Sequence, residues 1–126
     1  MTAFVSYQHA QRELRISKYC GNYMASIGKV GVLYAMDNEG SFPTCWRDLE
    51  NDMSSPQILI CPGSAHHDAE FSWSTFSETD SSYEIVSPGL SQDKVDTVFF
   101  RCKIHGHLGY PDATVFDGEK RRTKEW

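Results

Sequence analysis

The chain has 126 residues, of which 40% are hydrophobic, and a formal net charge of −5 at pH 7. This length supports one hydrophobic core but not two, so we predict a single domain. The negative charge would repel a phosphate backbone, which argues against nucleic acid as a partner. No apolar run reaches the roughly 18 residues of a membrane-spanning helix, and the first twenty residues contain no signal-type apolar segment.

The first predicted element is a long helix over residues 1–37. From Ile16 onwards, apolar residues recur at a spacing close to 3.6, which forms one apolar stripe along a helix. The helix should end near residues 37–40, because Gly40 suits a left-handed cap and Pro43 cannot continue a helix. About thirty residues at 1.5 Å per residue reach roughly 45 Å, so the first turns should project from a small domain. The predicted core face of the helix consists of Met24, Ile27, Val30 and Tyr34.

The rest of the chain is predicted to form a connecting loop, a sheet and a tail. The loop covers residues 38–56 and includes a short helix, because Trp46, Leu49 and Met53 would share one helical face. Residues 120–126 form a short basic tail. The fold class is therefore α+β, with the long helix packed on an antiparallel sheet of about three to four strands. The sheet region covers residues 57–119, with strands expected at 58–61, 82–89, 96–102 and 113–119 and a chain reversal at Asp117-Gly118.

Cysteine and histidine residues are the candidates for specific chemistry. The cysteines show no CxxC spacing, so they are compatible with four buried thiols or with two disulfides in three possible connectivities. Zinc is a further possibility, because cysteine and histidine are its preferred ligands. The four cysteines are Cys20, Cys45, Cys61 and Cys102, and the candidate zinc ligands are Cys61, His66, Cys102 and His105.

Catalysis is not expected from this sequence. A Cys102 nucleophile with His105 as its base is the enzyme hypothesis, but residues three apart on a strand do not share a face. No oxyanion element or third orienting group is evident. The acidic residues of the polar stretches lack the regular spacing of a calcium-binding loop, so we interpret them as solvated carboxylates. These acidic residues are Asp68, Glu70, Glu78, Asp80 and Asp93.

Three separated blocks of the sequence carry a resemblance to a known family. They are residues 20–43 (CGNYMASIGKVGVLYAMDNEGSFP), residues 59–62 (LICP) and residues 105–118 (HGHLGYPDATVFDG). In their order and spacing, these blocks resemble the type IV pilin-like proteins that carry a prepilin-type cleavage and methylation signal. They are also similar to the related pseudopilins of type II secretion.

The resemblance implies a structural subunit of a type IV pilus-like or type II secretion pseudopilus-like fibre. Such a subunit assembles through its amino-terminal helix with copies of itself and with other pilin-like subunits. Members of this family are anchored in the inner membrane by an apolar first half of the helix, and their globular part lies on the outer side. This sequence lacks that half, so we expect either a trimmed soluble ectodomain or a soluble relative. The implied location is extracytoplasmic, in the periplasm or at the cell surface.

This implied location favours disulfides over zinc. In an oxidising compartment we expect a Cys61–Cys102 disulfide, with Cys20 and Cys45 as the second pair and a Cys20–Cys61 pairing left open. No cofactor is then expected. The alternatives are zinc at the Cys/His residues, or calcium, which some pseudopilins hold in a loop near the sheet. The alternative function is a soluble metal- or small-ligand-binding module that uses the Cys/His cluster.

Overall fold

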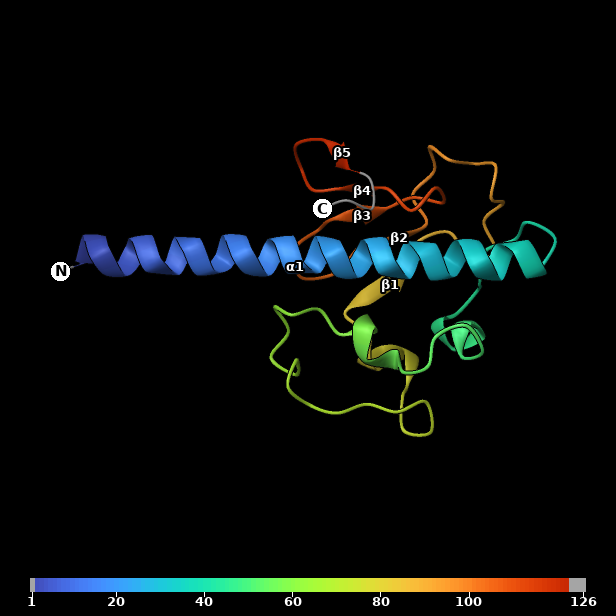
Figure 1. The fold of residues 1–126 in the computed structure, drawn as a ribbon, viewed down its shortest axis with the longest axis horizontal. Coiled ribbons are helices and arrows are strands. Elements are labelled where there is room, and N and C mark those ends of the chain that lie inside the picture. Colours follow the sequence, from blue (N-terminus) through green and yellow to red (C-terminus); the bar gives the residue numbers. More distant parts are fainter. Residues whose placement is uncertain (1, 123–126) are drawn as a thin grey trace.

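A computed structural model describes the backbone of residues 2–122 and the side chains of residues 8–121, and it places one long helix against a small sheet (Figure 1). The predicted α+β class, a long helix packed on an antiparallel sheet, is confirmed. No helix in the described part of the chain is long and apolar enough to cross a membrane. The helices are α1 (Thr2–Asp37) and the 3-10 helices η1 (Trp46–Leu49), η2 (Pro56–Leu59) and η3 (Glu78–Asp80). The strands are β1 (Tyr83–Ile85), β2 (Phe100–Cys102), β3 (Leu108–Gly109), β4 (Val115–Phe116) and β5 (Arg121–Arg122).

Helix α1 crosses the globular part with its second half and extends beyond it with its first half (Figure 1). Burial of its side chains follows the same division, because Leu14 is 65% exposed whereas Cys20 is fully buried. Of the predicted core face, Met24 and Ile27 are fully buried. Val30 and Tyr34 are half-buried and pack against the edge of the same core.

The helix ends where the sequence predicts. Glu39 and Gly40 have φ angles of 58° and 80°, and the backbone N–H of Gly40 donates to the carbonyl oxygen of Ala35 at 2.8 Å. Left-handed residues at this position close a helix by satisfying its last carbonyls. The reversal carries Phe42 back into the core against Gly31, where a Cβ atom would lie 2.8 Å from the Phe42 ring. Gly31 therefore allows the close approach of the returning chain.

The sheet is an antiparallel meander in the order β1-β2-β3-β4-β5. The predicted reversal at Asp117-Gly118 joins β4 to β5, with Gly118 at a φ of 98° and the Asp117 carboxylate accepting the N–H of Glu119 at 3.0 Å. Strands β3 and β5 have only two residues each and were not predicted. Strand β5 occupies the start of the predicted tail 120–126, of which residues 123–126 lie outside the described part.

The predicted strand at 58–61 is wrong. Pro56 lacks an N–H and has a fixed φ, which suits the first position of a helix, and the Ser55 hydroxyl caps η2 by accepting the N–H of Gln57 at 3.2 Å. The predicted sheet region 57–119 is corrected accordingly, because the sheet begins at Tyr83 and includes β5. The end of η2 contacts the residue before β1 through the backbone bond from the Ser82 N–H to the Leu59 carbonyl oxygen at 2.9 Å.

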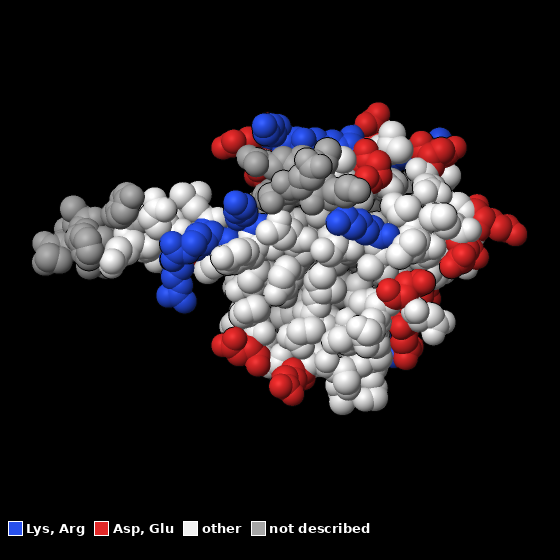
Figure 2. All heavy atoms as spheres, in the orientation of Figure 1, with Lys and Arg blue, Asp and Glu red and all other residues white. Residues whose placement is uncertain are grey.

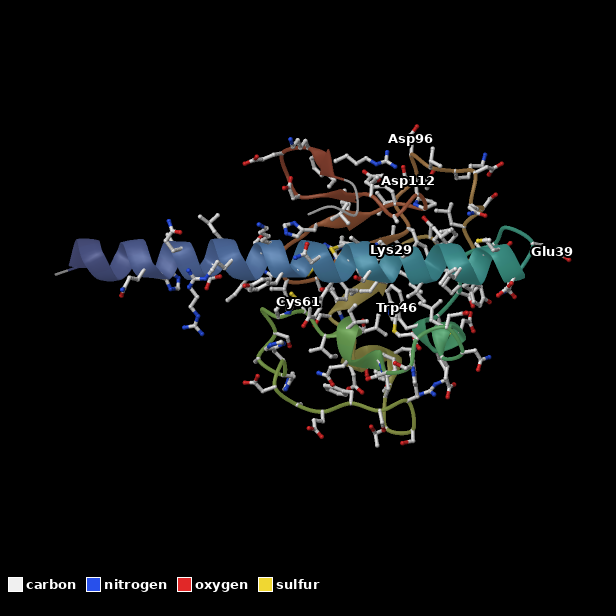
Figure 3. The ribbon with its side chains drawn as sticks, viewed as in Figure 1. Lys29, Glu39, Trp46, Cys61, Asp96 and Asp112 are labelled. Carbon is white, nitrogen blue, oxygen red and sulfur yellow. The ribbon has the colours of Figure 1, made fainter. Side chains whose placement is uncertain are left out.

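An aromatic cluster fills the space between η1 and the sheet, with Trp46 below the helix in the view of Figure 3. Trp46 is 2% exposed, and its indole N–H donates to the Tyr83 carbonyl oxygen at 2.9 Å. Its ring meets the rings of Phe99 and Phe100 edge to face, with centroids 6.1 and 5.5 Å apart. Edge-to-face pairs of this kind stabilise a core beyond the area that they bury.

Gly109 gives the sheet a position that a larger residue cannot occupy. It lies opposite Phe100 in the β2–β3 register, and a Cβ atom there would lie 2.1 Å from the Phe100 ring. We expect Gly109→Ala to lower the free energy of unfolding by about 1–3 kcal/mol, because this ring is fixed by its aromatic neighbours. Urea unfolding followed by tryptophan fluorescence measures the change.

The control for this substitution is Gly118→Asn. A Cβ at Gly118 would meet no atom within 4 Å, so this substitution reports only the cost of a side chain at a φ of 98°, whereas Gly109 is not among the glycines with positive φ. Asparagine tolerates positive φ better than most residues, so Gly118→Asn should lower the unfolding midpoint less than Gly109→Ala does. A Gly109→Ala variant as stable as the wild type would show that the Phe100 ring can move aside.

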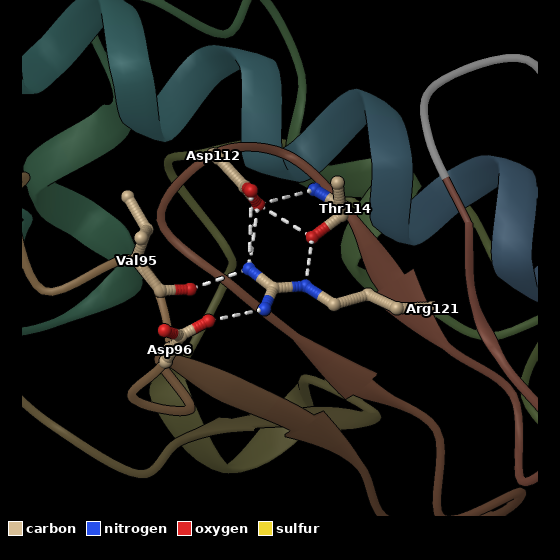
Figure 4. A network of polar contacts seen from close by, with 5 residues as sticks. All are labelled: Val95, Asp96, Asp112, Thr114 and Arg121. Atoms are coloured by element: carbon tan, nitrogen blue, oxygen red, sulfur yellow. Dashed lines mark hydrogen bonds and ion pairs between the residues drawn. The ribbon is translucent and has the colours of Figure 1, made fainter.

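Arg121 in β5 connects the last strand to the loop before β2 and to the loop between β3 and β4 (Figure 4). Its guanidinium contacts Asp96 at 2.8 Å and both carboxylate oxygens of Asp112 at 3.1 Å, and it also donates to the Val95 carbonyl oxygen. The guanidinium carbon lies 3.8 Å from the centre of the Tyr110 ring. Partial burial would raise the pKa of Asp112, but hydrogen bonds from Thr114 and the guanidinium of Arg121 hold it below its ordinary value. The guanidinium of Arg121 therefore donates its hydrogen bonds to groups of its own chain.

Candidate metal centre

Four ligand-type side chains converge between helix α1 and the sheet. One sulfur each from Cys20, Cys61 and Cys102 and one ring nitrogen of His105 all lie within 4.8 Å of one another. The three cysteines are fully buried and His105 is half-buried. In the described part of the chain, this is the one set of three or more histidine, cysteine and acidic side chains with the spacing to hold a metal ion.

Each ligand comes from a different local structure. Cys20 lies in the middle of α1, Cys61 follows η2, Cys102 ends β2, and His105 lies in the turn between β2 and β3. Cys61 lies against the helix near the point where the helix leaves the globular part (Figure 3). The predicted ligand His66 is a wrong assignment, because its side chain is exposed and outside this group. Cys20 takes its place.

Two tight turns present Cys61 and Cys102 to the site. In the first turn, the Gly63 N–H donates to the Cys61 sulfur at 3.4 Å, and a Cβ at Gly63 would come within 3.0 Å of the His105 ring. In the second, the His105 N–H donates to the Cys102 sulfur at 3.3 Å. Gly106 completes this turn with a φ of 76° and an N–H bond to the Cys102 carbonyl oxygen at 2.9 Å. Backbone donors aimed at sulfur stabilise the thiolate over the thiol.

The third sulfur has a side-chain donor. The Tyr83 hydroxyl lies 3.5 Å from the Cys20 sulfur, and once that thiol is deprotonated only the hydroxyl can donate. Burial raises the pKa of Tyr83, so its hydroxyl keeps the proton that it donates. Every sulfur of the group therefore has its own hydrogen-bond donor.

Three distances within the group are close to those between ligands of one tetrahedral ion, and all four ligand atoms lie within 4.8 Å of one another. Zn–S bonds of about 2.3 Å and Zn–N bonds of about 2.0 Å place two sulfurs roughly 3.8 Å apart, and a sulfur and a nitrogen roughly 3.5 Å apart. The Cys20 and Cys102 sulfurs are 3.6 Å apart. The Nδ1 atom of His105 lies 3.3 Å from the Cys61 sulfur and 3.7 Å from the Cys102 sulfur. The imidazole thus turns Nδ1 toward the sulfurs.

Proton affinities differ within the group because the thiols share hydrogen bonds. Bonds from Cys20 and Cys61, together with backbone N–H groups, lower the pKa of Cys102 well below its ordinary value. The bond to Cys102 raises the pKa of Cys61 to about 11 and also raises that of Cys20. A metal ion bound by these residues would displace the protons of the thiols.

His107 supports the group from outside. Its ring stacks on that of His105, with centroids 5.3 Å apart and planes 16° apart. The Nε2 atom of His107 lies 3.0 Å from the Ser17 hydroxyl on α1. Burial lowers the pKa of His107, which favours a neutral ring beside His105. Outer contacts of this type fix the orientation of a ligand ring.

All four cysteines are free thiols in the structure, so neither of the predicted disulfides is present. Cys61 and Cys102, the first predicted pair, share the site with a third sulfur, from Cys20. Cys45, the predicted partner of Cys20, is half-buried beside η1 and does not belong to the converging group. The Cys20–Cys61 pairing that the sequence leaves open joins two other members of the same group.

The acidic residues considered for calcium have other roles or lie apart. The Glu78 carboxylate accepts the backbone N–H groups of Trp46 and Arg47 at 2.8 and 2.9 Å. The Asp80 carboxylate accepts the N–H of Ser77 at 2.8 Å and closes its own capping box. Neither carboxylate belongs to a metal-type group among the described residues.

Comparison of the chain with models of protein families, with curated proteins and with solved structures finds no match. Two features of the structure bear on function, the projecting helix and the closed group of three cysteines and one histidine.

Proposed function

We propose that the chain is the globular part of a structural subunit of a type IV pilus-like or type II secretion pseudopilus-like fibre. One observation carries this proposal: α1 is 36 residues long, and its first half lies outside the globular part (Figure 1). A monomer gains no packing from a helical segment of that kind, and helix stability in water comes mainly from packing. A projecting helix is therefore suited to contacts with other copies.

The side chains on the projecting segment support association between unlike surfaces. Residues 8–19 contain three basic residues and one acidic residue, whereas the whole chain carries a net charge of −5. On the face shown in Figure 2, basic side chains lie where the helix leaves the globular part. Acidic side chains lie along the edge of the globular part in the same view. The helix of one copy can thus be attracted to the globular part of the next.

Under this proposal the globular part is extracytoplasmic, its partners are copies of itself and other pilin-like subunits, and its work is mechanical. It needs no catalytic group. The Cys102–His105 pair of the enzyme hypothesis belongs to the converging ligand group, where Nδ1 of His105 faces the sulfurs of Cys61 and Cys102.

Site-specific photo-crosslinking in cells tests the proposal. The chain would carry a fused apolar segment of about 20 residues ahead of its first residue, which supplies a membrane anchor. A photoreactive amino acid replaces Leu14, which is 65% exposed on the projecting segment, or Val86, which is 48% exposed beside the sheet. We expect irradiation to link Leu14 to further copies of the same chain in a ladder of products.

The Val86 position serves as the matched control, because both side chains are exposed but only Leu14 lies on the projecting helix. It should give far less of the ladder. A folded, membrane-inserted chain that yields no self-adduct from Leu14 would contradict the fibre proposal.

A further inference from the structure

We propose that the chain binds one structural Zn²⁺ ion between helix α1 and the sheet, through Cys20, Cys61, Cys102 and His105. This inference rests on the ligand group alone and does not depend on the fibre proposal. Its geometry is that of a closed site, because the protein itself supplies all four ligands and three of them are fully buried. Closed four-ligand sites are structural, whereas catalytic zinc keeps one position for water or substrate.

Convergence of three sulfurs favours a metal over a disulfide. A disulfide uses two sulfurs, so it would leave the third buried thiol and the His105 nitrogen next to the bond without a role. Zinc uses all four atoms. Moreover, backbone N–H groups donate to the sulfurs of Cys61 and Cys102, and the Tyr83 hydroxyl lies where it could donate to a Cys20 thiolate. The sulfurs of a disulfide carry no charge that needs such donors.

The ligand types select the metal. Calcium and magnesium require oxygen ligands, of which this group has none. Soft thiolates with one imidazole in a four-coordinate arrangement are the usual set for zinc. Three thiolates and a neutral imidazole around Zn²⁺ leave one excess negative charge. The three hydrogen-bond donors lie where that charge would be spread over sulfur.

The ion would join parts of the chain that are distant in sequence. Cys20 and Cys102 are separated by 82 positions, and Cys61 adds the segment that follows η2. The site lies near the point where the helix leaves the globular part (Figure 3). Zinc here would hold α1 to the sheet and to the segment after η2, close to where the helix begins to project. A disulfide could join only two of these segments.

The first test is the metal content of the whole chain, purified without chelator. We expect elemental analysis to find one zinc per chain, and thiol titration in denaturant with chelator to find four free thiols. Cobalt exchanged for zinc should give sulfur-to-cobalt charge-transfer absorption together with the intense visible bands of tetrahedral Co²⁺.

Two pairs of variants locate the site. Cys102→Ser and His105→Ala remove proposed ligands, and each should weaken zinc binding at least 100-fold in a chelator competition. Cys45→Ser and His66→Ala are the matched controls, because these residues lie outside the group, and both should bind zinc as the wild type does. If a ligand variant does not fold, the cobalt spectrum of the unaltered chain still reports thiolate coordination.

Three results would overturn the inference. The first is a zinc-free chain with two thiols missing, which would establish a disulfide. The second is a chain with four free thiols that takes up neither zinc nor cobalt after refolding with the metal. The third is zinc that Cys45→Ser or His66→Ala removes as effectively as Cys102→Ser, because the ion would then lie elsewhere.

Discussion

Chelation is expected to lower the free energy of unfolding of the zinc-loaded chain by about 4 kcal/mol, if free zinc is present at about 1,000 times its dissociation constant. The physical reason is that zinc requires the folded arrangement of ligands from four separate segments, so the binding energy is available only to the folded state. Thermal unfolding with and without a strong chelator measures the difference. For a domain of this size, the melting temperature should fall by more than about 10 °C.

The variants make this prediction specific. Chelator should leave the melting temperature of His105→Ala unchanged, because that variant has already lost the metal, whereas Cys45→Ser should respond as the wild type does. Acidification should release zinc as well, since protons compete for the thiolates and the imidazole. If the melting temperature of the zinc-loaded wild type did not change when chelator was added, a structural role for the ion would be contradicted.

The sequence predicts three members of the converging Cys/His group and misses the fourth, Cys20. Residue type and the Cys-x2-His spacing of Cys102 to His105 and Cys-x4-His spacing of Cys61 to His66 predict the other three correctly but give His66 as the fourth. The usable signal was the helical pattern: Cys20, Met24 and Ile27 recur at spacings of four and three, so Cys20 lies on the buried face. What the sequence could not provide was the register that places that turn of the helix over the end of β2.

The fold was predictable where the pattern was long and less so where elements were short. Helix α1 follows from a stripe of many turns, and the reversal at Asp117-Gly118 follows from local turn chemistry. Strands β3 and β5, with two residues each, have no pattern of their own and depend on pairing with distant neighbours. The segment 58–61 has a strand-like composition, but Pro56 and the Ser55 cap favour a 3-10 turn instead.

Trp46→Ala is expected to lower the free energy of unfolding by about 3–5 kcal/mol, the usual range for truncation of a buried large aromatic residue. Trp46 is 2% exposed, and it joins η1 to the sheet through edge contacts with Phe99 and Phe100. Its loss would leave a cavity under the helix and a Tyr83 carbonyl oxygen without its side-chain donor. Chemical unfolding followed by far-ultraviolet circular dichroism measures the loss independently of tryptophan emission.

Two further variants separate the contributions of the Trp46 side chain. Trp46→Phe keeps an aromatic ring but removes the donor to Tyr83, so its cost should lie between zero and that of Trp46→Ala. Tyr19→Ala removes an aromatic side chain that is 53% exposed on α1, and it should change the unfolding free energy by no more than about 0.5 kcal/mol. If Trp46→Ala cost no more than Tyr19→Ala, the aromatic cluster could not be what holds η1 against the sheet.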